Sequence, residues 1–200
     1  MDNTKDDKVH VQTKEWANPT PAGLVALAVA CFCFFALLNG FVKPSAMPLL
    51  GCWLIGGFLV QLIVGLLDLK GGNHTGGNTF LYFSAFFMLV GGLEMFTKHY
   101  GSLPGNPLDA RIDGWAWAAL TLVVWLWTPA FFKTFGFLSL IVAGLCVACP
   151  FIALIDLGVL PKSLSPIPGY ALLAAALIAI YYSAALVVNS AYGKKLYPVL

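Results

Sequence analysis

The sequence predicts an all-α, polytopic membrane protein with six transmembrane helices. Two observations carry this prediction: 60% of the 200 residues are hydrophobic and only 10% are charged, and six long apolar runs follow one another along the chain. A soluble domain carries roughly 25% charged residues, and a 200-residue globule cannot hide this much apolar surface from water. The composition therefore excludes a disordered chain and argues against a soluble enzyme.

Each apolar run is long enough to cross about 30 Å of hydrocarbon as a helix, and each is bounded by charges, proline or glycine. Tracts such as residues 171–180 do not alternate as the strands of a membrane barrel would. Residues 1–17 form a polar tail that mixes both signs of charge, and residues 18–200 form one membrane domain. The predicted spans are residues 21–42, 46–67, 78–97, 114–132, 134–160 and 168–192.

An even number of spans places both termini on the same side of the membrane. Basic residues mark the cytoplasmic side of membrane proteins. Those on the terminal side are Lys5, Lys8, Lys14, Lys70, Lys133, Lys194 and Lys195, against Lys43, Lys98, Arg111 and Lys162 on the other. We therefore expect a multi-pass protein of the plasma (inner) membrane, surrounded by lipid, with both termini in the cytoplasm. The net charge of +2, without a basic stripe, predicts no nucleic-acid partner.

The reactive side chains do not form a catalytic pattern. All three histidines lie in the tail or in loops, and the five cysteines lie within apolar spans. Cys146 and Cys149 are formally a C-x-x-C pair, but a hydrophobic helix favours packing over redox chemistry. The sequence therefore predicts no enzyme, no catalytic residue, no metal site and no cofactor.

Polar residues inside the predicted spans are the candidates for function, because burying them in lipid is costly. Gln61 lies deep in the second span. Glu94 and Asp156 lie at the outer ends of the third and fifth spans, where they either accept protons in an acidic vestibule or are hydrated at the interface. All Lys and Arg residues lie in tails, loops or span ends. A conducted anion must then be held by helix N-termini, backbone N–H groups or amides, or else the solute is neutral. Six spans of this composition favour a narrow pore through one bundle.

The segment Asn18-Pro19-Thr20-Pro21-Ala22-Gly23-Leu24 marks the start of the first span. Asn18 is a good N-cap, Pro19 is a good first helical residue, and Pro21 still lies in the first turn. This geometry predicts a helix whose positive end faces the membrane surface. The segment is either a weak anion site or a helix start alone.

This segment resembles the N-P-x-P-L-G-L signature of the acetate uptake transporter family, with Ala22 in place of the usual Leu. The resemblance extends over residues 18–198, although His74 and Thr75 stand where the family has Thr-Phe. Further matches are Gly56-Gly57, Gln61, Gly65-Leu66-Leu67, Lys70, Gly72-Asn73 with Phe80, and Asn189…Tyr192-Gly193-Lys194…Pro198.

The resemblance implies six helices around one pore per protomer, a homohexamer, and uptake of acetate and related monocarboxylates, with succinate in some members. It allows either a proton symporter or a channel. It further implies a hydrophobic constriction at Leu27, Phe83 and Leu140, with Val142 as the alternative to Leu140. Leu27 and Phe83 depart from the family's Phe and Tyr. We expect Asn18 and Gln61 to supply polar contacts.

Two other classes of function stay open at this stage. An uncharged interior equally suits a channel for neutral solutes such as urea or amides. A membrane sensor or scaffold that binds a partner through residues 1–17 is a third reading.

Overall fold

The computed structural model describes residues 16–101, 108–133 and 136–200, and it confirms the all-α fold with six helices long and apolar enough to span a membrane. The protein is therefore a multi-pass membrane protein. The third span combines two α-helices with a π-helical segment between them, and short 3₁₀ turns precede the second and sixth spans. The elements are α1 (Thr20–Leu38), α2 (Met47–Lys70), α3 (His74–Tyr82), the π-helical segment (Phe83–Val90), α4 (Gly91–Tyr100), α5 (Arg111–Phe132), α6 (Phe137–Asp156) and α7 (Pro166–Tyr192).

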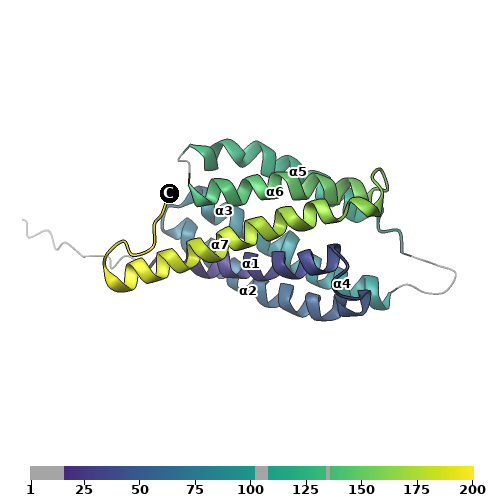
Figure 1. The fold of residues 1–200 in the computed structure, drawn as a ribbon, viewed down its shortest axis with the longest axis horizontal. Coiled ribbons are helices and arrows are strands. Elements are labelled where there is room, and N and C mark those ends of the chain that lie inside the picture. Colours follow the sequence, from purple (N-terminus) through teal and green to yellow (C-terminus); the bar gives the residue numbers. More distant parts are fainter. Residues whose placement is uncertain (1–15, 102–107, 134–135) are drawn as a thin grey trace, which may run out of the picture.

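The six spans run side by side in an elongated bundle (Figure 1). α1 packs between α2 and α7, α6 packs between α5 and α7, and the third span packs on α2. The third span and α5 meet through aromatic side chains. The ring centroids of Tyr82 and Trp127 are 5.3 Å apart, and those of Phe87 and Trp117 are 5.8 Å apart. The spans thus follow one another around a common interior.

Two predicted spans are too long, and a glycine explains each correction. The first span ends at Leu38 rather than Val42, and the fifth ends at Asp156 rather than residue 160, whereas its predicted start at residue 134 lies outside the described residues. Gly40 and Gly158 follow these helix ends with φ angles of +71° and +77°. Side chains disfavour this left-handed backbone, so glycine there ends the helix even where apolar residues continue.

At the end of the bundle where the chain enters α1, two spans extend into polar sequence. α2 continues past the predicted end at residue 67 to Lys70, so that Asp68 lies within the helix. The third span begins at His74 rather than residue 78, because the Asn73 side chain accepts a hydrogen bond from the backbone N–H of Gly76 at 3.0 Å. These extra turns bring polar groups to the end of the bundle where the chain enters α1.

Glycines bring α2 close to the third span at both ends of the bundle. A Cβ atom at Gly65 would lie 2.8 Å from Leu81 Cγ and 3.0 Å from the Gly77 carbonyl oxygen. A Cβ atom at Gly51 would lie 2.8 Å from the carbonyl oxygen of Gly92. The two backbones are therefore nearly in contact, which fixes the first turn of α3 against α2.

Candidate functional site

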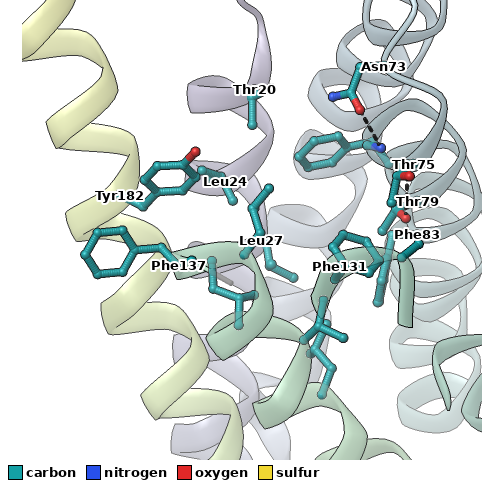
Figure 2. A pocket seen from close by; sticks show the side chains of 18 of the residues that line it. Thr20, Leu24, Leu27, Asn73, Thr75, Thr79, Phe83, Phe131, Phe137 and Tyr182 are labelled. Carbon is teal, nitrogen blue, oxygen red and sulfur yellow. Dashed lines mark hydrogen bonds between the residues drawn. The ribbon is translucent and has the colours of Figure 1, made fainter. Parts of the chain in front are cut away.

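A cavity of about 430 Å³ lies at the end of the bundle where α1, α3 and α6 begin (Figure 2). Its wall combines hydroxyl and amide groups from α1, α2, α3 and α7 with apolar side chains. The polar lining residues are Thr20, Gln61, Asn73, Thr75, Thr79 and Tyr182. The apolar lining residues include Leu24, Leu27, Phe80, Phe83, Phe131, Phe137, Leu138, Ile141, Val142 and Leu145. Such a wall suits a small solute with one polar and one apolar end.

Three helices direct their N-terminal ends at this cavity. Thr20 is the first residue of α1, Asn73 is the N-cap of α3, and Phe137 is the first residue of α6. α5 contributes Ala130 and Phe131 from its last turns. Each helix N-terminus carries about half a positive charge. No Lys or Arg is among the described residues that line the cavity, so these helix ends supply the positive potential.

Gln61 is the buried amide of the cavity wall. Only 1% of the residue is exposed. Its Nε2 donates to the Gly23 carbonyl oxygen at 3.4 Å, which ties α2 to α1, while its Oε1 has no hydrogen-bond partner among the described residues. An unpaired buried acceptor is costly, so a solute or water that donates a hydrogen bond here is favoured. The structure thus brings the predicted Gln61 to the cavity.

The predicted constriction is brought together at two of its three positions. Leu27 and Phe83 both line the cavity and are each 6% exposed. Val142, the alternative to Leu140, is among the described lining residues of the cavity, and Leu140 is not. At about 3.6 residues per turn, the lining face of α6 passes through residues 138, 141, 142 and 145, and Leu140 lies off this face.

The interior is closed beyond Phe83. Phe87 packs edge-on against Phe83 at 5.7 Å and stacks on Phe34 at 5.3 Å. Met88 and Cys31 are completely buried in the same region. The cavity therefore reaches from one end of the bundle to an apolar plug of tightly packed side chains.

The opening motif starts α1 differently from the prediction, because Pro19 rather than Asn18 is the N-cap residue and no side chain caps the helix from that position. The Asn18 side chain accepts a hydrogen bond from the backbone N–H of Thr20 at 3.0 Å. Pro19 immediately precedes the helix instead of forming its first residue. The carbonyl oxygen of Pro21 accepts a hydrogen bond from the Ser183 hydroxyl at 2.9 Å, which ties α1 to α7.

The last two motif residues act through packing. A Cβ atom at Gly23 would lie 2.5 Å from the Phe80 ring, so only glycine lets that ring lie against α1. Leu24 is 1% exposed and lines the cavity. The motif thus shapes the cavity wall as well as the start of the helix.

The segment that follows α7 folds back toward the cavity (Figure 1). Gly193 adopts a left-handed conformation with φ +60° and ends the helix. The Asn189 side-chain oxygen then accepts the backbone N–H groups of Leu196 and Tyr197 at 2.8 and 2.9 Å. Leu200 lines the cavity together with Thr20, so the described parts of both terminal regions lie at this end.

The two predicted protonation candidates lie at the opposite end of the bundle. Lys98 forms an ion pair with Glu94 one turn earlier on α4, and its Nζ lies 3.0 Å from Asp113 Oδ2 on α5. Asp156, at the end of α6, is half-buried. The sequence analysis placed Lys98 on this side of the membrane but did not anticipate its pairing with Glu94 and Asp113, so Glu94 is not a free carboxylate.

Sequence reasoning missed two residues that line the cavity, Thr75 and Thr79, and one that lies behind its wall, Asp68. Thr75 and Thr79 lie one helical turn apart, and the Thr79 hydroxyl donates to the Thr75 carbonyl at 2.8 Å. Asp68, interpreted as the end of a span, lies inside α2 two turns after Gln61. The spacing of 61, 65 and 68 on one helical face was the signal that could have found it. In the part of the chain that the structure describes, no group of three or more His, Cys, Asp or Glu could hold a metal ion.

The fold and cavity define a polytopic membrane protein with a solute-sized chamber inside one bundle. Its fold is that of the bacterial acetate channel SatP, with a TM-score of 0.80 at 19% sequence identity over 92% of this chain and 99% of that one. The resemblance to the acetate uptake transporter family is thereby confirmed at the level of the fold.

Two proteins of Saccharomyces cerevisiae (strain ATCC 204508 / S288c) are similar in sequence. Ammonia transport outward protein 2 is 31% identical over 114 residues, which are 51% of this chain and 39% of that protein. Accumulation of dyads protein 2 is 31% identical over 139 residues, which are 63% of this chain and 48% of that protein. The matches thus span less than half the length of these relatives. No protein-family model matches the chain.

Proposed function

We propose that this protein is a membrane permease or channel for acetate and related short-chain monocarboxylates. The observation that carries the proposal is the cavity on which three helix N-termini converge without a lysine or arginine among its described lining residues. Helix ends hold a single negative charge without the strong binding that a fixed cation would cause. The fold shared with an acetate channel supports the same class of solute.

The apolar wall fits the other end of such a solute. The carboxylate binds near Thr20, Asn73 and Thr79, and the short alkyl group faces Leu24 and Phe80. Passage then requires movement past Leu27, Phe83 and Val142, an apolar constriction that gates by excluding water. We place the end of the bundle that holds residues 16 and 200 on the cytoplasmic side of the plasma membrane. We expect a homohexamer, as the family resemblance implies.

The direct test is uptake of labelled acetate into proteoliposomes, with and without an inward proton gradient. We expect saturable uptake above the leak of free acetic acid, with competition by other short monocarboxylates; competition by succinate defines how far the substrate range extends. The neutral-solute alternative is not favoured by the fold likeness. Free passage of urea without acetate uptake would nevertheless restore it and overturn the proposal.

The route is tested by a matched pair of substitutions on α6. Val142→Trp places a large ring in the cavity, and we expect it to reduce acetate uptake at least about tenfold by blocking passage. Leu140→Trp lies off the lining face and serves as the control, with uptake near that of the unmodified protein. Phe83→Ala and Leu27→Ala widen the constriction, and we expect them to admit larger monocarboxylates. Unchanged flux and selectivity in these variants would remove the constriction assignment.

A further inference from the structure

Asp68 is a buried carboxylate that the proposed route does not yet use. Only 3% of the residue is exposed, and it is the one acidic residue that is fully buried in the part of the chain that the structure describes. It lies on the same face of α2 as Gln61, two turns closer to the end of the bundle. Burying a carboxylate is expensive unless it is paired or protonated, so its retention beside a cavity calls for a functional explanation.

Asp68 lies directly behind the cavity wall. Its Oδ2 accepts a hydrogen bond from Asn73 Nδ2 at 3.2 Å. The same oxygen lies 2.9 Å from the position that a Cβ atom would take at Gly76. Asn73 and Gly76 both line the cavity. A single layer of atoms therefore separates the carboxylate from the place where the proposed substrate anion binds.

No ion pair among the described residues neutralises Asp68. Lys70, on the same helix, lies with its Nζ 4.6 Å from the centre of the Trp16 ring. On the third span, His74 is exposed at the first residue of α3, and Tyr82 stacks on Phe83. The other titratable residues of this span belong to α4 at the opposite end of the bundle: Glu94, Lys98, His99 and Tyr100. On α1, the titratable residues are Cys31 and Cys33, more than two turns beyond Thr20. Hydrogen bonds from the side chains of Asn73 and Thr20 and the nearby helix N-termini offset part of the Asp68 charge, but among the described residues no cation stands between it and an anion in the cavity.

We propose that Asp68 is the positioning residue that couples proton uptake to anion binding in the cavity. This inference rests on the proposed function. Two negative charges this close repel in a medium of low dielectric constant. Taking up one proton from water at the cavity mouth converts the Asp68 carboxylate to the neutral acid and removes the repulsion. By linkage, the proton then tightens anion binding as much as the anion tightens proton binding.

The sign of the coupling follows from this repulsion. Protonated Asp68, which is favoured as pH falls, binds the anion more tightly. The KM for acetate of the unmodified protein should therefore rise between about pH 6 and about pH 8, by about fivefold or more. Asp68→Asn keeps an oxygen that can accept from Asn73 but cannot be charged. Its KM should stay low and flat over this range, and proton-driven accumulation should be lost while acetate exchange persists.

Two controls separate coupling from a merely structural role. Glu94→Gln removes a carboxylate that is ion-paired at the other end, and it should keep the pH-dependent KM. Asp68→Ala removes both the charge and the acceptor for Asn73, so it should lose stability as well as coupling. A pH-dependent KM that survives in Asp68→Asn would overturn the inference.

A second measurement does not depend on transport. Infrared difference spectra of the purified protein, recorded with and without ¹³C-acetate near neutral pH, should show a protonated carboxyl band appearing on acetate binding, and the band should be missing in Asp68→Asn. Absence of the band in the unmodified protein overturns the role of Asp68 even if both variants fail to transport. Acetate uptake with no such band leaves the proposed function standing, whereas absence of both uptake and band overturns both.

Discussion

The two ends of the bundle place similar side chains in opposite settings. At the opposite end, Glu94 and Asp113 share the cation Lys98, which links α4 to α5. At the cavity end, Asp68 is more deeply buried, and its hydrogen-bond partners are uncharged groups, the Asn73 amide and the Thr20 side chain. A carboxylate that holds a counterion contributes to packing, and one that lacks it is sensitive to any further charge nearby. Whether a carboxylate has a cation as its partner, rather than how deeply it lies in a span, therefore indicates whether it serves packing or function.

The largest loss of stability should come from substituting the glycines through which α2 contacts the third span at each end of the bundle. Gly65→Ala and Gly51→Ala each push a Cβ atom into the third span, and we expect each to cost about 1–3 kcal/mol because the opposing atoms include backbone. Thermal unfolding in detergent measures this loss. Only Gly65→Ala should also raise the KM for acetate, because it displaces the first turn of α3 that carries Asn73.

Gly56→Ala is the matched control on the same helix, since a Cβ atom there meets nothing within 4 Å. It should leave unfolding and uptake unchanged or slightly stabilise the helix. If Gly51→Ala affected the KM as strongly as Gly65→Ala, the two ends would not be functionally distinct.

The spans were predictable from the sequence because lipid demands long apolar helices, whereas their ends and rotation were not. Hydropathy cannot register that Gly40 and Gly158 turn the chain before the apolar run stops. Hydropathy also places the end of the second span at Asp68, because it assumes that charged residues lie outside the membrane. It does not consider that a charged side chain can face the interior of the bundle. Leu140 was chosen by matching along the chain, but its place on α6 depends on helix rotation, which only packing against α7 and α5 determines. Glu94 and Lys98 are four residues apart, which is the spacing of neighbours on a helix, so their ion pair could have been predicted from the sequence.

A second, smaller loss of stability should follow from Lys98→Met. This substitution keeps the length of the side chain but leaves Glu94 and Asp113 facing each other without a cation. The three side chains are only 18–25% exposed, so we expect a loss of about 1–2 kcal/mol, discounted for partial screening. Unfolding in detergent at low and high salt measures it.

The pH dependence of the acetate KM should not change in Lys98→Met, because the Asp68 environment is untouched. The double variant Lys98→Met/Glu94→Gln should recover part of the lost stability, since it removes one of the two facing charges. A failure to recover any would mean that Lys98 contributes by packing alone.

A still smaller effect is expected from Glu94→Gln and Asp156→Asn. Lys98 keeps Asp113 as its partner when Glu94 loses its charge, so we expect a change below about 1 kcal/mol for each single variant. The measurement that matters is the pH profile of acetate uptake. An unchanged pH profile in both variants would show that Glu94 and Asp156 are not proton acceptors in transport. An altered pH profile would assign the proton coupling to this end of the bundle instead of to Asp68.

The smallest effect should come from the exposed ion pair that precedes α5. Arg111 Nε and Nη2 lie 2.8 and 2.6 Å from the Asp109 carboxylate oxygens, and these hydrogen bonds lower the pKa of Asp109 to about 2. A lowered pKa stabilises the fold above the ordinary pKa of about 3.9, and that contribution is lost as pH falls toward about 2. Because water screens this pair fully, Asp109→Asn should leave the unfolding temperature at neutral pH within error of the unmodified protein. Unfolding temperatures of Asp109→Asn and Lys98→Met, measured side by side, then show whether burial makes an ion pair matter here: equal losses would mean that the Lys98 cluster is held no more tightly than a surface pair.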